Sequence, residues 1–276
     1  MLISTFLNSE RQLRNGWWIL LFFFGLASLL VPTLLIAQQH EMDVSISWQA
    51  TIILIVSILC QLLRQKPLAE LLGNFDVCWL KELLLGILLG SALMLIPAFI
   101  LGIFGWVDWR WSPMDLSVLA SSASLFAGVA VAEELLFRGF VFQRLISGLG
   151  MWPAQLITAA FFLLSHVNNP GMTGSTKVMA GINIFLASIM FGLAFVRTKS
   201  LAVPLGLHWM ANWVQGAILG LAVSGSEQSG LLKPVFGNAP VWLTGGQFGL
   251  EASLPGLLCV LIILLMLFMR KPTSHR

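Results

Sequence analysis

The sequence predicts an all-α fold, a polytopic transmembrane bundle of about eight helices that forms one integral-membrane domain. Hydrophobic residues make up 58% of the 276-residue chain and charged residues only 10%. An ordinary soluble domain is about 25% charged, so this chain has too few charges to cover a surface that faces water. The apolar residues form continuous runs rather than an alternating pattern, which excludes a membrane β-barrel.

Eight apolar segments approach the ~20 residues that cross the hydrocarbon core of a bilayer. They are Trp17–Ala37, Trp48–Leu63, Leu80–Phe104, Leu116–Phe142, Trp152–Val167, Val178–Val196, Leu201–Val223 and Ser253–Met269. The first is too long for the apolar region of a signal peptide and no small-residue cleavage site follows it, so we expect a retained anchor. The fifth ends in Asn168-Asn169-Pro170-Gly171, and we expect it to stop within the protein.

The Lys and Arg residues predict that both termini are cytoplasmic. With eight spans and an inside N-terminus, the outside loops contain only Arg110, Lys177 and Lys233. The inside segments contain Arg11, Arg14, Arg64, Lys66, Lys81, Arg144, Arg197, Lys199, Arg270, Lys271 and Arg276. This is the positive-inside bias of membrane proteins. The net charge of +3 therefore indicates loop topology, and we expect no nucleic-acid partner.

The chain divides by its polar content into three parts of one domain. Residues 1–115 hold the N-terminal helices, residues 116–223 hold the polar residues at membrane depth, and residues 224–276 hold a loop and the last helix. An ionisable residue at membrane depth is costly and by default suggests function. Four stand out: Glu133 and Glu134 in the fourth span, His166 in the fifth and His208 in the seventh. The other acids, Glu251 among them, fall in predicted loops.

The two adjacent glutamates are expected to have different roles. Glu134 and Arg138 are four residues apart, so they lie on one face of the helix and can form an ion pair. Glu133 lies about 100° around the helix from Glu134, so the two carboxylates cannot project in the same direction. Taken alone, an ion pair such as Glu134 with Arg138 more often holds helices together than takes part in chemistry.

Two further pairs share the four-residue spacing. Phe162 with His166 and His208 with Asn212 can each point into the bundle together. At ~1.5 Å per residue, Glu133 lies roughly 16 Å along its helix from Arg144 and His208 about 12 Å from Ser200. By the same measure, His166 lies about 21 Å from Trp152. Each residue alone has an ordinary packing role, such as an interhelical hydrogen bond. Six polar or charged groups on three spans, however, favour one shared site in a single layer.

These motifs resemble those of the CPBP family, also called Abi. They are Glu-Glu-x-x-x-Arg at Glu133, Glu134 and Arg138, then Phe-x-x-x-His at Phe162 and His166, then His-x-x-x-Asn at His208 and Asn212. The family includes type II CAAX prenyl endopeptidases and bacteriocin-processing or immunity proteins. The resemblance covers roughly residues 116 to 223, and no motif residue is missing.

The resemblance implies an eight-helix intramembrane peptidase in which a glutamate and a histidine activate water. Carried over, Glu133 is the general base with His166 as its partner, and His208 and Asn212 are the oxyanion donors. Glu134 and Arg138 would orient the first pair, and Phe162 is expected in the cavity wall. Amide hydrolysis needs such a base and such donors.

Cofactor use stays open at this point. The family is often classed as metalloproteases, and Glu133, His166 and His208 could hold Zn²⁺. The mechanism can also be drawn with no metal, and the usual zinc-peptidase signature His-Glu-x-x-His is absent. Serine and aspartate proteolysis are disfavoured, because the chain has no Gly-x-Ser-x-Gly motif and no Asp within a span.

Two other functions compete with an endopeptidase that cuts near the cytoplasmic face. One is a non-catalytic relative that acts as a scaffold or a bacteriocin-immunity factor. The other is a proton-coupled transporter, which the lack of an internal repeat disfavours. The expected location is the inner membrane of a bacterium. The expected partners are the lipid bilayer and a hydrophobic peptide or membrane-protein substrate.

Overall fold

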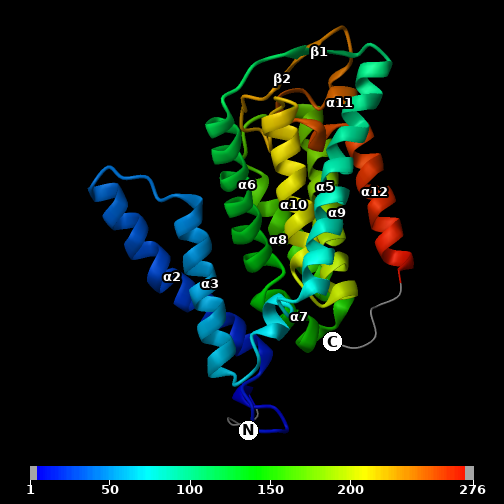
Figure 1. Ribbon diagram of the computed structural model, residues 1–276. Helices are drawn as coiled ribbons and strands as arrows, with labels where there is room; N and C mark the ends of the chain where they lie inside the picture. Colours follow the sequence, from blue (N-terminus) through cyan, green and yellow to red (C-terminus); the bar gives the residue numbers. More distant parts are fainter. Residues whose placement is uncertain (1–4, 271–276) are drawn as a thin grey trace.

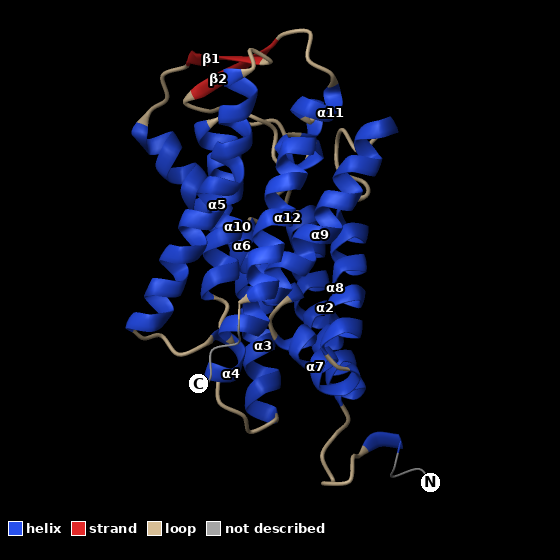
Figure 2. Cartoon of the chain, turned by 90° about the vertical axis from the view of Figure 1, so that its right-hand side faces the viewer, coloured by secondary structure: helices blue, strands red, loops and turns tan. Residues whose placement is uncertain are grey.

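The computed structural model describes residues 5–270 and is helical almost throughout (Figures 1 and 2). The main helices are α2 (Asn15–Gln39), α3 (Ile46–Leu63), α5 (Val77–Ile103), α6 (Leu116–Phe137), α8 (Met151–His166), α9 (Gly174–Thr198), α10 (Ala202–Trp213) and α12 (Leu254–Met269). Each of the eight predicted spans overlaps one of them, although the fourth and the seventh extend beyond their helices, and the all-α class is confirmed. Lys271 and Arg276, which the topology prediction uses, lie outside the described residues.

Short elements connect the main helices. They are α4 (Ala69–Leu72), α7 (Phe140–Leu149), the π-helix η1 (Val214–Ile218), α11 (Val241–Thr244), and the 3₁₀ helices η2 (Gly246–Phe248) and η3 (Leu250–Ala252). Strands β1 (Val107–Trp111) and β2 (Leu232–Phe236) pair antiparallel, with Val107 opposite Phe236. This small sheet covers one end of the bundle, and α7 lies at the other, the end toward which α12 runs (Figure 1).

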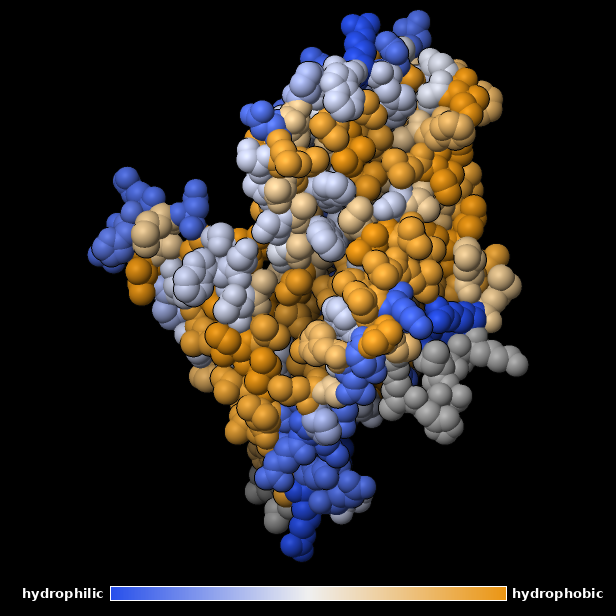
Figure 3. All heavy atoms as spheres, viewed as in Figure 1, coloured by the Kyte–Doolittle hydropathy of each residue, from blue (hydrophilic) through white to orange (hydrophobic). Residues whose placement is uncertain are grey.

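The outer surface of the bundle is suited to lipid. Five helical stretches are long and apolar enough to cross a membrane: Asn15–Gln39, Ile46–Leu63, Ala69–Ile103, Leu116–Leu149 and Gly174–Thr198. Large apolar side chains point outward, with Phe24 73%, Phe99 68% and Phe161 61% exposed. Much of the face in Figure 3 is accordingly hydrophobic. Exposed apolar surface on this scale is stable only in a bilayer, so the chain is an integral membrane protein.

Two predicted spans are not continuous α-helices. The fourth, Leu116–Phe142, is broken at Arg138 and Gly139, which separate α6 from α7. A Cβ added at Gly139 would overlap the carbonyl oxygen of Leu135, so the turn requires glycine there. The seventh, Leu201–Val223, leaves α-helical geometry after Trp213 and continues as η1. A π-turn of this kind is often found next to a functional site.

Glycines bring α5 and α10 into close contact. A Cβ added at Gly86 would overlap the backbone of α10 at Val203, and one added at Gly90 would overlap it at Leu207. Small residues four apart allow two helix backbones to approach closely in a membrane, where helix association depends on van der Waals packing. This contact fixes the position of α10, which carries two of the predicted site residues.

The α2–α3 hairpin is joined to the bundle through α6 and α7. At the start of α3, Ile46 and Ser47 lie against Gly128 of α6. Helix α2 lies outside α3 and leans away from the bundle (Figure 1). Near the other end of the hairpin, Phe22 of α2 is fully buried and stacks on Phe140 of α7, with ring centroids 5.8 Å apart. Helix α2 is therefore anchored through α7, directly after the break in the fourth span.

Candidate active site

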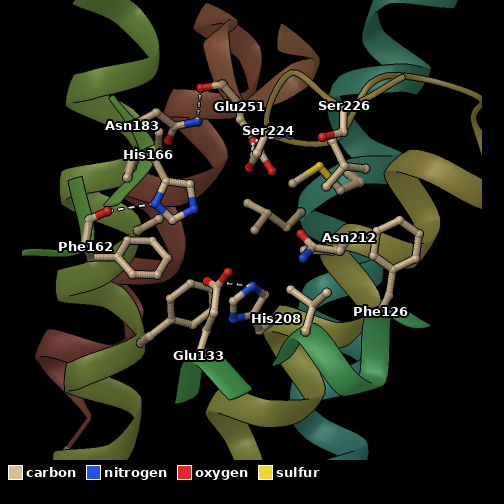
Figure 4. Close-up of a pocket in the computed structure, with 18 of the residues that line it drawn as sticks. Phe126, Glu133, Phe162, His166, Asn183, His208, Asn212, Ser224, Ser226 and Glu251 are labelled. Carbon is tan, nitrogen blue, oxygen red and sulfur yellow. Dashed lines mark hydrogen bonds and ion pairs between the residues drawn. The ribbon is translucent and has the colours of Figure 1, made fainter. Parts of the chain in front are cut away.

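A cavity of about 300 Å³ lies inside the bundle between α5, α6, α8, α9 and α10 (Figure 4). All four predicted catalytic residues line it: Glu133, His166, His208 and Asn212. Phe162 forms part of the wall, as expected. The volume is at the lower end of the range for small-molecule and peptide sites. Residues from all three motifs thus line one cavity inside the bundle.

The two adjacent glutamates occupy different environments. Glu133 lines the cavity, its side chain is 26% exposed, and its Oε2 has no hydrogen-bond partner among residues 5–270. Glu134 is fully buried, and its Oε1 lies 3.2 Å from Nη1 of Arg138. The predicted ion pair is present, and the 100° offset between neighbours on a helix leaves Glu133 alone facing the cavity.

Arg138 is enclosed on every side. Its Nη2 donates to the carbonyl oxygen of Ser188 at 3.1 Å and to the Ser188 hydroxyl at 2.7 Å. Its guanidinium lies between the rings of Phe162 and Phe191, 4.8 and 5.0 Å from their centroids. Hydrogen bonds and cation–π contacts of this kind compensate in part for burying the charge. Arg138 therefore holds Glu134 in place from behind the cavity wall.

His208 connects the two glutamates. Its Nδ1 lies 2.8 Å from Glu134 Oε1, and its Nε2 lies 3.7 Å from Glu133 Oε2. Because a carboxylate can only accept, the short contact places a proton on Nδ1 and turns Nε2 toward the cavity. Phe191 stacks on the imidazole with a centroid separation of 4.9 Å. The ring is thus fixed in orientation by one hydrogen bond and one stacking contact.

His166 is oriented independently, at the end of α8. Its Nδ1 donates to the Phe162 carbonyl oxygen at 2.7 Å, and Ser165 Oγ lies 3.0 Å from the same nitrogen. The other ring nitrogen faces the cavity (Figure 4). The structure places His166 and Glu133 on the same cavity but in no direct contact, and the imidazole in contact with Glu133 is that of His208.

Asn212 lies one helical turn after His208 and also points into the cavity (Figure 4). It is 9% exposed, and no hydrogen bond to residues 5–270 engages its side-chain amide. An uncommitted amide in an enclosed site can donate to a developing negative charge.

The loops contribute a third carboxylate that the sequence did not suggest. Glu251, which was predicted only to lie in a loop, lines the cavity on the side opposite Glu133 (Figure 4). Its Oε2 accepts from the Ser224 amide at 3.0 Å and the Ser224 hydroxyl at 2.8 Å, and its backbone carbonyl accepts from Asn183 at 2.6 Å. Burial raises the pKa of the Glu251 carboxyl, against the lowering effect of the Ser224 hydrogen bonds.

Two residues of α9 were also missed. Ser188 binds Arg138 and Phe191 stacks on His208, and neither belongs to a motif with an obvious chemical role. Their spacing of three residues places them on one face of α9. From the sequence, this spacing gives only a weak indication that both residues pack against the same site. Glu251 offered no signal, because it becomes part of the cavity only when η3 folds against Ser224.

The predicted alternative donor set does not form a metal site. Among residues 5–270 no three His, Cys, Asp or Glu side chains come together in a way that could hold an ion. Glu133 and His208 are in contact, but His166 directs Nδ1 to the Phe162 carbonyl and is not in contact with either. These residues, as arranged, therefore do not fit Zn²⁺.

Comparison with known proteins gives one match. Residues 115–214 match the model of a protein family described as type II CAAX prenyl endopeptidase Rce1-like. Neither the curated proteins nor the solved structures include a match to this chain. The matched segment runs from α6 to the end of α10 and contains every predicted site residue. This match agrees with the resemblance of the sequence motifs to the CPBP family, which includes the type II CAAX prenyl endopeptidases.

Proposed function

We propose that the protein is an intramembrane endopeptidase in which Glu133 activates a water molecule against a peptide bond. The observation that carries this proposal is the different state of two neighbouring carboxylates. Glu134 is fully buried and its Oε1 is committed to Arg138 and His208, whereas Glu133 lines a cavity that His166 and Asn212 also line. The Oε2 atom of each glutamate has no hydrogen-bond partner among residues 5–270, but only Glu133 is at the cavity. A carboxylate placed at a cavity in this way can take a proton from a bound water molecule.

In the first step, water attacks the scissile carbonyl carbon. Glu133 takes one proton from the water, and His166 accepts a hydrogen bond from the other through the ring nitrogen that faces the cavity. The new C–O bond forms as the carbonyl π electrons move to the oxygen. The result is a tetrahedral intermediate with one negative charge on oxygen and a proton on Glu133.

Asn212 and His208 stabilise that oxyanion. The Asn212 amide donates one hydrogen bond. His208 donates from Nε2, which requires the imidazolium form because Nδ1 already donates to Glu134 at 2.8 Å. The Glu134 carboxylate lies against this imidazole, and Arg138 holds Glu134 in position. This arrangement gives each motif residue a distinct role.

In the second step, the intermediate collapses. The C–N bond breaks, the carbonyl re-forms, and the leaving nitrogen takes the proton from Glu133. The products are a carboxylic acid and an amine, and Glu133 is again a carboxylate. No metal takes part, so we expect a strong chelator to leave the rate unchanged. Loss of activity on chelation and its recovery with Zn²⁺ would contradict this route.

The substrate is a hydrophobic peptide or a segment of a membrane protein. Most of the cavity wall is apolar, with Leu93, Leu125, Phe126 and Met190 among its residues. Such a wall favours apolar side chains on either side of the scissile bond. Whether the substrate also carries a prenyl group can be read from cleavage assays with matched prenylated and unmodified peptides.

The decisive test compares two glutamate variants in purified protein. Glu133→Gln keeps the shape of the side chain but removes the base, so peptide cleavage should slow about 10²–10⁴-fold. Glu227→Gln removes an exposed loop carboxylate and should leave the rate unchanged. Full activity of Glu133→Gln would show that the residue is structural and that the proposed site is wrong.

We also propose that both termini face the cytoplasm and that cleavage occurs near that face. The basic residues gather on one side under the eight-span topology. Reporter fusions at residues 40–43 and at the C-terminus should report opposite sides of the membrane. Two reporters on the same side would contradict the topology. The location of the protein in the inner membrane of a bacterium stays a prediction.

A further inference from the structure

A second cavity, of about 1020 Å³, lies at the end of the bundle where α2 begins, α3 ends and α7 lies. It is separate from the candidate active site. Three arginines line it, Arg14, Arg64 and Arg144, and no acidic residue among those described does. The cavity is therefore positively charged.

Arg144 is the most informative of the three. It is only 8% exposed, and its Nε has no hydrogen-bond partner among residues 5–270. One hydrogen bond from Nη1, to Asn15 Oδ1 at 3.3 Å, engages the guanidinium. A buried guanidinium with a free donor is costly unless a ligand satisfies it.

A second arginine lies close to it. The guanidinium carbons of Arg64 and Arg144 are 5.9 and 5.8 Å from the centroid of the Phe140 ring. The nearby acid, Glu70, is exposed, accepts a hydrogen bond from Gln61 and lines a neighbouring cavity that Arg144 also lines. One exposed carboxylate does not balance two partly buried arginines, so the remaining positive charge favours an anion from outside the chain.

The backbone adds further donors. The 25-residue helix α2 begins at this cavity, and no side chain caps its N-terminus. The first N–H groups of a helix and its dipole favour an anion, a phosphate above all. The uncapped start of α2 and the unpartnered Nε of Arg144 occur at the same cavity. Both features favour an anionic ligand there.

The rest of the cavity wall combines polar residues, such as Asn8, Ser9 and Gln12, with apolar residues that border the lipid-facing surface. Trp17 and Trp18 line it, and such residues are enriched where a membrane meets water. Leu20 and Leu149 also line it and are 58% and 54% exposed. An inorganic phosphate would leave these side chains uncovered, whereas acyl chains would pack on them.

We propose that this cavity binds the phosphate headgroup of an anionic phospholipid, with its acyl chains against Leu20 and Leu149. Basic pockets between helices at the cytoplasmic end are suited to such headgroups. The ligand would contact the start of α2, the end of α3 and α7 together, and so would strengthen the connection of α2 to α7.

The test measures lipid binding to delipidated full-length protein in neutral detergent by native mass spectrometry. Phosphatidylglycerol should bind at least about tenfold more tightly than phosphatidylcholine, since each charge-assisted hydrogen bond contributes on that order. Inorganic phosphate should not displace it at equal concentration. Equal binding of the two lipids, or displacement by phosphate, would overturn the proposal, the latter in favour of a free-anion site.

Matched variants locate the site. Arg144→Gln should weaken phosphatidylglycerol binding about tenfold or more. If that variant does not fold, Arg14→Gln, at an exposed position, should weaken the same binding several-fold through loss of one charge. Lys81→Gln, an exposed charge early in α5 and outside the cavity, should have no effect. Equal losses in Arg14→Gln and Lys81→Gln would show diffuse attraction and refute a defined site.

Discussion

Glu134 Oε1 and His208 Nδ1 lie 2.8 Å apart although 74 residues separate them in sequence. The same oxygen lies 3.2 Å from Arg138 Nη1. Glu134 is therefore a fixed connection between α6 and α10 and has no lone pair free at the cavity on that oxygen. The contact also orients His208 so that its second nitrogen faces Glu133 at 3.7 Å. In the proposed mechanism, Glu133 acts as the base because Glu134 is already held by Arg138 and His208.

Loss of Arg138 should damage folding as well as activity. Arg138→Ala leaves Glu134 as a buried charge without its cation, a change that typically costs about 3–5 kcal/mol of unfolding free energy. Adding Glu134→Gln removes the uncompensated charge, so the double variant should yield more monodisperse protein and unfold at a higher temperature. Size-exclusion chromatography and thermal unfolding in detergent would measure both. Equal yields from the single and double variants would contradict the ion-pair description.

Asn212→Ala should separate catalysis from binding. Removal of one oxyanion donor should lower kcat about 10²–10³-fold and leave KM nearly unchanged, because the donor acts mainly on the charge of the transition state. Steady-state cleavage of a hydrophobic peptide measures both constants. Asn238→Ala, at an exposed loop position, is the control and should behave as wild type. A raised KM with normal kcat would instead assign Asn212 to substrate binding.

The close contact of α5 and α10 should be sensitive to a single methyl group. Gly90→Ala would force Cβ into the backbone of α10 at Leu207, so we expect a loss of about 1–3 kcal/mol and weaker cleavage as His208 shifts. Gly181→Ala is the control, because its Cβ would meet only Leu163 at an ordinary 3.7 Å. Thermal unfolding of the two variants compares them directly. Equal stability would show that the helices adjust without strain.

Glu251 should make stability depend on pH. Its pKa is raised in the folded protein, so folding is favoured while the carboxyl is protonated and this advantage is lost as pH rises through the raised pKa. Glu251→Gln cannot ionise, and its unfolding temperature should therefore rise relative to wild type from acidic to neutral pH. Glu227→Gln, in an exposed loop, should show no such trend. A difference that stays constant with pH would contradict ionisation of a buried Glu251.

Several features of this protein follow from its sequence alone because they depend on neighbouring residues. A continuous apolar run specifies a membrane helix whatever surrounds it, and all eight predicted spans fall on helices. The four-residue spacing of Glu134 and Arg138 is enough for their ion pair, since the helix itself brings the two side chains together. The offset of Glu133 follows from the same geometry.

Only the tertiary structure decided which groups meet across helices. His208 contacts both glutamates, Ser188 binds Arg138, and Glu251 enters the cavity through a loop, and none of these contacts has a sequence period to reveal it. The break at Gly139 likewise depends on a turn that lets Arg138 point into the core. Helix formation is specified by local spacing, whereas the choice of partner is settled by packing between segments that are distant in the chain.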